Sequence, residues 1–477
     1  MAQSDVRETV PTAERLLEEG KVDSAMQLLT GHLRTHSKDS DALRLLARAL
    51  YWSGRSDEAR LRYEEAMVLA PQNVGLQLEY ARMLAETGGS DQAREILIPL
   101  TLREASAAGA LELLGTMNYW EGDWTAARKF FVEALARDPG NREARRQLNE
   151  IAITTASTAS LGFQYGDDTQ PLRRLTLTGE VDFHLTPLQR LRFRAEPQFV
   201  NVSDTAKSVF TADVTWKAFF PSSLETELSA GIVTRSFDDK ADLTWKGLLG
   251  VRLQTHVVVR ATAERLASLY TSASFSTPVM TTSGGLELGW NHPSGGMGRA
   301  SLELIRFPDD NTLRRLSGWI LIPLSGPAPV RFSFGYGFNA QHAEENLFTL
   351  VGGAPSFPGS YIPYYTPTNL SVHSLLGLLR IKLSSATEFQ LNGSYGVFAR
   401  EDAPSFVADT TPPQRTSVER VFFQRDFHPF NVKATLTAGV SSSGSLVLEA
   451  VHSSNTFYEF THVNLKFSHR FLPSDYQ

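Results

Sequence analysis

The chain has 477 residues, more than one hydrophobic core usually holds, so at least two domains are expected. Its 46 Lys and Arg residues and 52 Asp and Glu residues give a formal net charge of −6. Residues 1–150 carry a net charge of −5 and residues 151–477 a net charge of −1, so neither part has the basic excess that nucleic-acid binding requires. The absence of cysteine excludes disulfides, thiolate metal sites, cysteine nucleophiles and a lipidated N-terminal cysteine.

The N-terminal third repeats with a period of 34 residues, which is the length of a tetratricopeptide repeat. We predict a solenoid of four repeats over residues 1–152. In each repeat a glycine ends the first helix, where a left-handed cap costs little, an alanine marks a close helix crossing, and a large residue fills the gap to the next repeat. The glycines are Gly20, Gly54, Gly88 and Gly122, the alanines are Ala25, Ala59, Ala93 and Ala127, and the large residues are Leu29, Tyr63, Leu97 and Phe131.

A solenoid of this kind binds partners and carries no chemistry of its own. Its aromatic residues are interpreted as packing between repeats, and the alternative is peptide binding by one or two of them. They are Tyr51, Trp52, Tyr80, Tyr119 and Trp120.

From residue 153 onward the pattern changes to a period of two, which is typical of strands. Apolar residues such as Leu191, Phe193 and Ala195 alternate with charged or small ones, so each strand has one apolar and one polar face. A soluble sandwich would also alternate. We prefer a transmembrane antiparallel β-barrel of about 16 strands over residues 153–477, because the strands are long and several apolar faces end in aromatic residues. The side chains predicted to face the lumen include Glu180, Asp182, Arg190, Arg192, Arg194, Glu196, Asp213 and Lys217.

The fold class is therefore α + β multidomain, and the expected location is the bacterial outer membrane, with lipid around the barrel and the repeat domain in the periplasm. The chain contains no run of about 18 apolar residues, and its first twelve residues are too polar for a signal peptide. We therefore expect that Met1 replaces a cleaved export signal.

The eleven histidines form no recognisable metal or catalytic motif, so no metal, no cofactor and no enzymatic activity are expected. One minor alternative is a lipid-cleaving barrel enzyme, for which His462, Asn464 and Ser468 share the polar face of the last strand. Polar residues facing the lumen are the usual explanation for that arrangement.

A long loop rich in Pro and Tyr joins two predicted strands between Gly352 and Asn369, and loops of this length are usually functional or disordered. Aromatic rings can stack on sugar faces, so four side chains are candidates for contact with a polysaccharide. The alternative, given equal weight, is that the loop packs into the barrel mouth. The candidates are Phe357, Tyr361, Tyr364 and Tyr365.

A tetratricopeptide solenoid joined to a large barrel resembles the exopolysaccharide secretion porins, namely the cellulose-synthase outer-membrane subunit and the poly-N-acetylglucosamine porin. The segment from Tyr361 to Leu383 is similar to the aromatic loop and following strand of the cellulose-type barrel. The resemblance implies a periplasmic scaffold that docks synthase components or modifying enzymes and feeds an exopolysaccharide chain into the pore. The charge balance of residues 151–477 favours a neutral or weakly charged polymer. The alternative is a non-conducting barrel that anchors a tetratricopeptide adaptor for protein–protein interaction.

Overall fold

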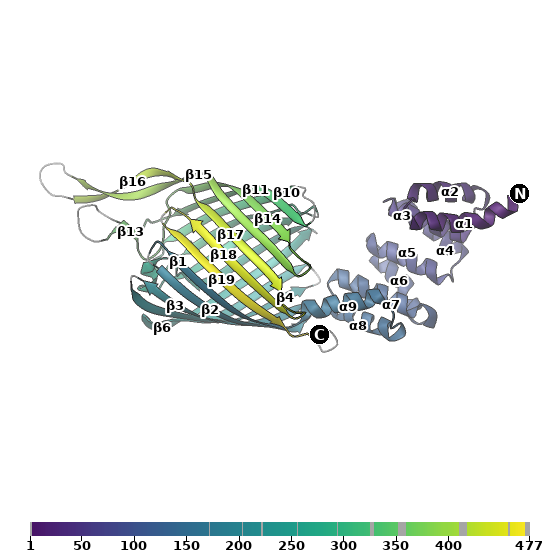
Figure 1. Ribbon diagram of the computed structural model, residues 1–477, viewed down its shortest axis with the longest axis horizontal. Helices are drawn as coiled ribbons and strands as arrows, with labels where there is room; N and C mark the ends of the chain where they lie inside the picture. Colours follow the sequence, from purple (N-terminus) through teal and green to yellow (C-terminus); the bar gives the residue numbers. More distant parts are fainter. Residues whose placement is uncertain are drawn as a thin grey trace. The chain divides into compact units, whose positions relative to one another are not determined.

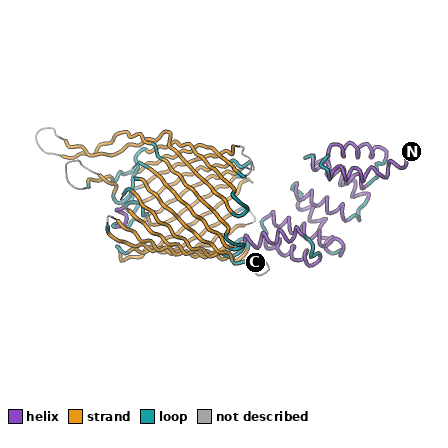
Figure 2. The backbone as a smooth tube through the Cα atoms, in the orientation of Figure 1, coloured by secondary structure: helices purple, strands orange, loops and turns teal. Residues whose placement is uncertain are grey.

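The computed structural model describes residues 2–170, 172–202, 204–220, 223–254, 256–292, 294–324, 329–351, 359–409, 417–456 and 458–472. The chain forms two compact units, Met1–Thr154 and Thr155–Gln477. The first unit is helical and the second is built from strands (Figure 2). None of the helices in the described ranges has the length and apolar character needed to span a membrane.

The helical unit is a row of antiparallel helix pairs closed by a final single helix (Figure 1). Each of the four glycines that the repeat pattern marks lies directly after a first helix or one residue beyond its cap, and each has a positive φ between 74° and 92°. The helices are α1 (Ala2–Glu18), α2 (Val22–Thr35), α3 (Ser40–Trp52), α4 (Ser56–Leu69), α5 (Val74–Glu86), α6 (Ser90–Thr101), α7 (Glu104–Glu121), α8 (Trp124–Arg137) and α9 (Arg142–Thr155).

The alanine and large-residue columns of the repeat are buried at the crossings between helices. Ala25, Ala59, Ala93 and Ala127 are fully buried, and Tyr63 and Phe131 are among the largest completely buried side chains. A side chain at Gly115 would approach the Phe131 ring to within 2.6 Å, which explains why a glycine stands opposite that ring. The sequence period thus corresponds to one repeated packing unit.

The first helices of successive repeats are also joined by polar contacts. Arg44 and Arg48 both bind Glu79 of the next repeat, at 2.6 and 2.7 Å. The Tyr119 hydroxyl donates to Glu150 at 2.8 Å. Two of the aromatic residues differ from their interpretation as packing residues, because Trp52 and Trp120 are each 52% exposed.

The second unit is one antiparallel sheet of seventeen strands that closes on itself, since β1 pairs with both β2 and β19. Strands β16 and β17 pair with successive parts of the long β15 and so share one place in the wall, which makes this a barrel of sixteen strand positions. The strands are β1 (Thr158–Asp168), β2 (Leu172–Thr186), β3 (Gln189–Val202), β4 (Thr205–Phe220), β5 (Leu224–Arg235), β6 (Asp238–Gln254), β7 (Val257–Ala267), β8 (Met280–Asn291), β9 (Met297–Arg306), β10 (Thr312–Leu324), β11 (Val330–Ala343), β14 (Leu370–Lys382), β15 (Thr387–Asp409), β16 (Ser417–Phe427), β17 (Phe430–Gly439), β18 (Gly444–Ser454) and β19 (Glu459–Arg470).

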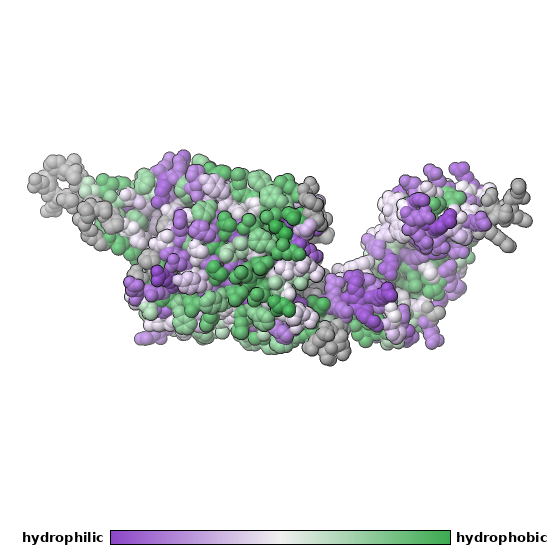
Figure 3. All heavy atoms as spheres, in the orientation of Figure 1, coloured by the Kyte–Doolittle hydropathy of each residue, from purple (hydrophilic) through white to green (hydrophobic). Residues whose placement is uncertain are grey.

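The outer face of the barrel is apolar, as lipid contact requires. On β1, for example, Leu161, Phe163 and Tyr165 point outward and are exposed, whereas Ser160 and Gln164 alternate with them on the interior face. The same alternation runs through the neighbouring strands, and apolar residues cover much of the barrel surface in Figure 3. This outer surface fits a protein of the outer membrane.

The two rims of the barrel differ in the length of their connections. At the rim where β1 begins and β19 ends, the strands are joined by short turns, such as the two residues between β2 and β3. At the opposite rim, β7 and β8 are separated by twelve residues and β11 and β14 by twenty-six. The ends of β15 and β16 project beyond the wall at that rim (Figure 1).

Candidate functional site

The loop between β7 and β8 folds into the barrel instead of projecting from it. It carries the short helix η1 (Ser272–Phe275), and the Phe275 side chain is 0% exposed. Phe275 packs against Leu172, Val200, Val209 and Val233, which are interior-facing residues of β2 to β5. The interior face of these strands is apolar only near the rim that carries the long loops. The loop between β7 and β8 packs against this apolar part of the wall.

Charged groups of the wall hold the same loop by its backbone. The Lys207 ammonium donates hydrogen bonds to the carbonyl oxygen of Phe275 at 2.7 Å and to the Ser276 hydroxyl at 2.9 Å. The Ser272 hydroxyl donates to the carbonyl oxygen of Gln170 at 2.6 Å. No motif in the sequence predicts that this loop folds inward, because its Ser- and Thr-rich composition between two clear strands marks it only as a connection.

The loop between β11 and β14 carries the tyrosines predicted to contact a polysaccharide, and two of them are buried by packing. Tyr364 is 4% exposed, and its ring stacks on Phe307 with the centroids 3.5 Å apart. The Tyr364 hydroxyl donates to Asp309 at 2.6 Å, and burial together with this carboxylate raises the Tyr364 pKa above its usual range. The predicted Phe357 lies outside the described residues.

The loop also contains a short hairpin of β12 (Phe348–Leu350) and β13 (Gly359–Tyr361). Tyr361 ends this hairpin and makes edge-to-face contacts with Phe348 at 5.2 Å and Tyr365 at 4.8 Å. Burial raises the pKa of Tyr361 to about 12. Tyr361 therefore supports the loop instead of lying open at the mouth.

Tyr365 is half-buried and connects the loop to two other elements. Its hydroxyl donates to Glu401 of β15 at 2.9 Å and lies 3.1 Å from the Thr456 hydroxyl, between β18 and β19. Burial and the Glu401 carboxylate raise the Tyr365 pKa well above its usual range. Glu401 is 1% exposed and forms an ion pair with Arg425 of β16.

The two inward loops touch each other at the mouth, because the Thr271 hydroxyl donates a hydrogen bond to the carbonyl oxygen of Pro363. Beside them lies an interior cavity of about 650 Å³. Its lining combines tyrosine rings and apolar side chains with hydroxyl and amide groups, the Glu264 carboxylate and one ion pair, Arg315 with Glu303 at 2.9 Å. The aromatic and neutral polar residues of the lining include Tyr270, Tyr364, Tyr365, Tyr458, Asn339, Gln341, Ser374, Ser394, Asn431 and Ser453.

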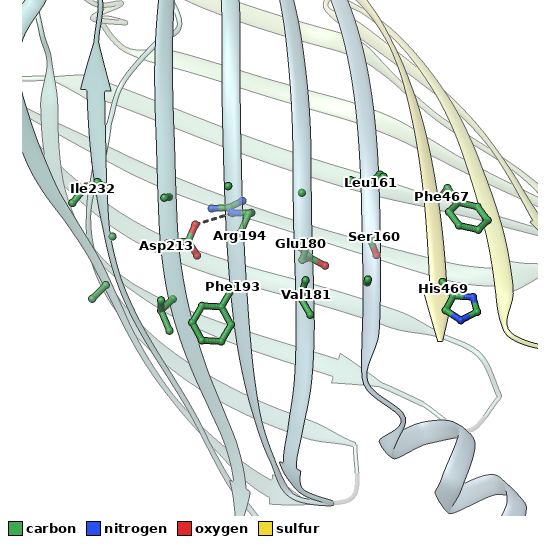
Figure 4. Close-up of a pocket in the computed structure, with 17 residues that line it drawn as sticks. Ser160, Leu161, Glu180, Val181, Phe193, Arg194, Asp213, Ile232, Phe467 and His469 are labelled. Atoms are coloured by element: carbon green, nitrogen blue, oxygen red, sulfur yellow. Dashed lines mark hydrogen bonds and ion pairs between the residues drawn. The ribbon is translucent and has the colours of Figure 1, made fainter. Parts of the chain in front are cut away.

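The charged residues predicted to face the lumen lie opposite the exposed apolar ones, and most of them form ion pairs across neighbouring strands. Arg192 lies 3.2 Å from Asp182 and 3.7 Å from Glu180. Arg194 lies 2.8 Å from Asp213, as the dashed line in Figure 4 shows, and 3.9 Å from Glu196. Two further members complete the set: Lys217 pairs with Glu227, whereas Arg190 has no ion pair within the described residues.

A depression of about 750 Å³ lies at the wall formed by β1 to β5 and β19 (Figure 4). It forms where small outward residues of adjacent strands pair in register, namely Gly179 with Ala195 and Ala195 with Ala212. Larger outward residues such as Phe193 and Phe467 border it. The lining also includes His469 and the residues Ser160, Glu180, Arg194 and Asp213.

Two of the three residues considered for lipid cleavage, Ser468 and His462, have separate partners. The Ser468 hydroxyl is hydrogen-bonded to Ser160 at 2.8 Å, and the His462 Nε2 atom lies 3.9 Å from Glu449. In the described part of the chain, no group of three or more His, Asp or Glu side chains is arranged to hold a metal ion.

Comparison with known proteins identifies the helical unit. Residues 16–67 and 78–142 match models of the tetratricopeptide repeat. The chain is also similar to the cellulose synthase 1 operon protein C of Komagataeibacter xylinus, with 26% identity over 155 residues. That region makes up 30% of this chain and 12% of the relative, so the chain spans only a small part of that protein's length.

Among solved structures, a bacterial polysaccharide outer membrane secretin aligns with a TM-score of 0.48 and 11% identity, over 67% of this chain and 99% of the other. CdiB from Acinetobacter baumannii aligns with a TM-score of 0.39 and 9% identity, over 66% of this chain and 60% of the other.

Proposed function

We propose that this protein is an outer-membrane porin that exports an exopolysaccharide through its barrel. The observation that carries the proposal is the interior cavity at the mouth, whose lining includes four tyrosine rings and several neutral hydroxyl and amide groups. Aromatic faces pack against the C–H faces of sugars, and amides and hydroxyls exchange hydrogen bonds with sugar hydroxyls. Tyr270, Tyr365 and Tyr458 are the exposed or half-exposed tyrosine rings that such a chain would meet.

The orientation of the barrel supports a periplasmic repeat unit. Outer-membrane barrels place short turns on the periplasmic side and longer loops outside the cell. Here the short turns lie at the rim where β1 begins, and the repeat unit joins the barrel through that strand. Tetratricopeptide repeats present extended binding surfaces, and the similar protein is named after a cellulose synthase operon. We infer that the repeats dock synthase components or modifying enzymes.

A second candidate function is a non-conducting barrel that anchors the repeats as an adaptor. The specific observation in its favour is that two loops fold inward at the same mouth and are hydrogen-bonded to each other through Thr271 and Pro363. On this hypothesis the loops form a permanent plug and the barrel serves only as a membrane anchor.

Single-channel recording separates the two functions. The full chain is reconstituted in planar bilayers, and neutral and acidic oligosaccharides are added from the short-turn side. Export predicts a conductance that at least one sugar series interrupts. In a matched variant, residues 272–276 are replaced by a Gly-Ser segment. This variant is expected to conduct more, because the inward loop then lacks the Phe275 side chain that packs it against the barrel wall. Silent bilayers with both proteins would instead support the adaptor, and currents that no sugar interrupts would contradict export.

A further inference from the structure

The short-turn rim of the barrel carries an excess of basic side chains on its interior face. Among the interior positions in the three strand residues nearest this rim, seven residues are basic and two, Glu225 and Glu388, are acidic. One of the seven, Arg299, is paired with Glu287 at 3.3 Å. The other six are here named the entrance collar: Arg190, Arg252, Arg331, Arg380, Lys382 and Arg470.

The strand alternation and side-chain contacts place the collar inside the barrel. Arg380 donates to the interior residue Gln390 at 3.2 Å, and Arg331 faces Arg380 in register. Arg470 shares its face with Lys466, which lies 3.3 Å from Glu180. Outward neighbours such as Leu253, beside Arg252, are exposed on the other face.

The collar differs from the rest of the interior because its side chains form no ion pairs within 4 Å in the described part of the chain, although Lys382 stands opposite Glu388 in register. Farther along the lumen, Arg192, Arg194 and Arg260 each lie against one or two carboxylates. Within the described residues none of the six collar side chains has an ion pair, and the Arg190 Nε atom is buried without a hydrogen-bond partner. Like charges directly opposite each other on paired strands, such as Arg331 and Arg380, are destabilising. An anion between them would remove that cost.

At the opposite rim the interior basic residues Arg174, Lys207 and Arg235 are held by the inward loop or by a carboxylate. The acidic residues beside the connections of that rim are also paired: Asp167 lies 3.3 Å from Arg173, Asp310 lies 2.6 Å from Arg306, and Glu344 lies 2.8 Å from Arg314. The near-zero net charge of residues 151–477 thus conceals a cluster of basic side chains without ion pairs at the short-turn rim. A low-dielectric wall concentrates the field of this cluster inside the lumen, so anions are drawn to that rim.

We propose that the entrance collar binds carboxylate groups of the exported polymer, so that the substrate is an acidic polysaccharide. This inference rests on the proposed export function and replaces the expectation of a neutral polymer that net charge alone suggests. Planar guanidinium groups bind carboxylates through paired hydrogen bonds, which suits the arginine-rich composition of the collar. The neutral and aromatic cavity at the mouth then contacts the sugar rings after the carboxylates have passed the collar.

The test uses trigalacturonate as the acidic probe, cellotriose as the neutral probe and inorganic phosphate to detect simple anion binding. The full-length protein is compared with the variant Arg331→Gln/Arg380→Gln/Lys382→Gln. The control variant Arg173→Gln/Lys240→Gln/Arg314→Gln removes the same charge from the other rim. Binding is measured by calorimetry in detergent, which does not require an open pore, and by current block in bilayers.

The collar variant is expected to bind trigalacturonate about tenfold more weakly, with cellotriose unchanged, and the control variant should stay within about twofold of the wild type. The wild-type affinity for trigalacturonate should also fall as salt is raised. Equal trigalacturonate binding by wild type and collar variant would overturn the inference, as would phosphate binding that accounts for the whole effect. If cellotriose binds and blocks as strongly as trigalacturonate, the inference of an acidic substrate is wrong, but the export function stands. If neither sugar binds or blocks, the export function itself fails.

Discussion

The Arg174 guanidinium lies 5.2 Å from the centroid of the Phe275 ring and donates a hydrogen bond to the carbonyl oxygen of Leu269 at 2.6 Å. One wall residue thus holds both the apolar tip and the backbone of the inward loop. Because the Phe275 ring is completely buried against interior valines and leucine, it is the main apolar anchor of that loop.

Phe275→Ala is therefore expected to release the loop between β7 and β8 from the barrel. Removing a buried phenylalanine ring costs about 3–5 kcal/mol, which is comparable to the whole stability that a short loop can have. The measurements are limited proteolysis between residues 268 and 279 and the conductance of single channels, both of which should increase. Tyr270→Ala is the matched control, because Tyr270 belongs to the same loop but is exposed, and it should leave both nearly unchanged. A loop that stays protected in Phe275→Ala would contradict this account.

Tyr364 allows the stacking of a ring to be separated from the hydrogen bond of its hydroxyl. Tyr364→Phe keeps the ring on Phe307 and loses only the bond to Asp309, at a cost of about 1–2 kcal/mol. Tyr364→Ala loses both and leaves a gap beside the cavity. We expect block by oligosaccharides to persist in Tyr364→Phe and to weaken severalfold in Tyr364→Ala, measured as the dissociation constant of the blocking sugar. Equal loss in both variants would mean that the hydroxyl, and not the ring, organises the mouth.

The sequence predicts the repeat unit and the barrel wall well because both are governed by strict periods. A 34-residue repeat fixes which alanines and glycines recur, and a two-residue alternation fixes which face of a strand each side chain occupies. The helices α1 to α9 and the closed sheet follow from those two patterns.

The mouth is harder to predict, because its contacts depend on closure of the barrel. Phe275 is buried only because β2 to β5 bring four apolar side chains together on the interior face near one rim. Tyr364 likewise meets Phe307 through a fold that spans fifty-seven residues of sequence. The basic entrance collar could have been found from the sequence by counting interior charges at each strand end separately instead of summing over the whole barrel.

Glu112 makes the stability of the repeat unit depend on pH. Burial raises the Glu112 pKa above its ordinary value of 4.5, and Arg82, at 3.5 Å, opposes this shift only in part. The folded state therefore holds the proton more tightly than the unfolded state, so stability is lost as pH rises from 4.5 through the raised pKa. Glu112→Gln should unfold at the same or a lower temperature than the wild type below pH 4.5 and at a higher temperature at neutral pH. Thermal unfolding of the helices, followed by circular dichroism across this range, provides the comparison. A Glu112→Gln variant that is less stable at every pH would show that the Arg82 ion pair outweighs burial.

Two glycines of the repeat unit should respond in opposite directions to the same substitution. Gly122 follows α7 with φ of 83°, where an L side chain is strained, so Gly122→Ala is expected to destabilise the repeat unit by about 1–2 kcal/mol. Gly31 lies inside α2, and a methyl group there meets no atom within 4 Å, so Gly31→Ala should stabilise the unit by about 0.5–1 kcal/mol. Both values come from denaturant unfolding of the full chain followed by its helical signal. Because the two variants add the same methyl group, opposite shifts identify the backbone conformation as the cause. A destabilising shift in both would mean instead that added volume, and not the left-handed cap, limits these positions.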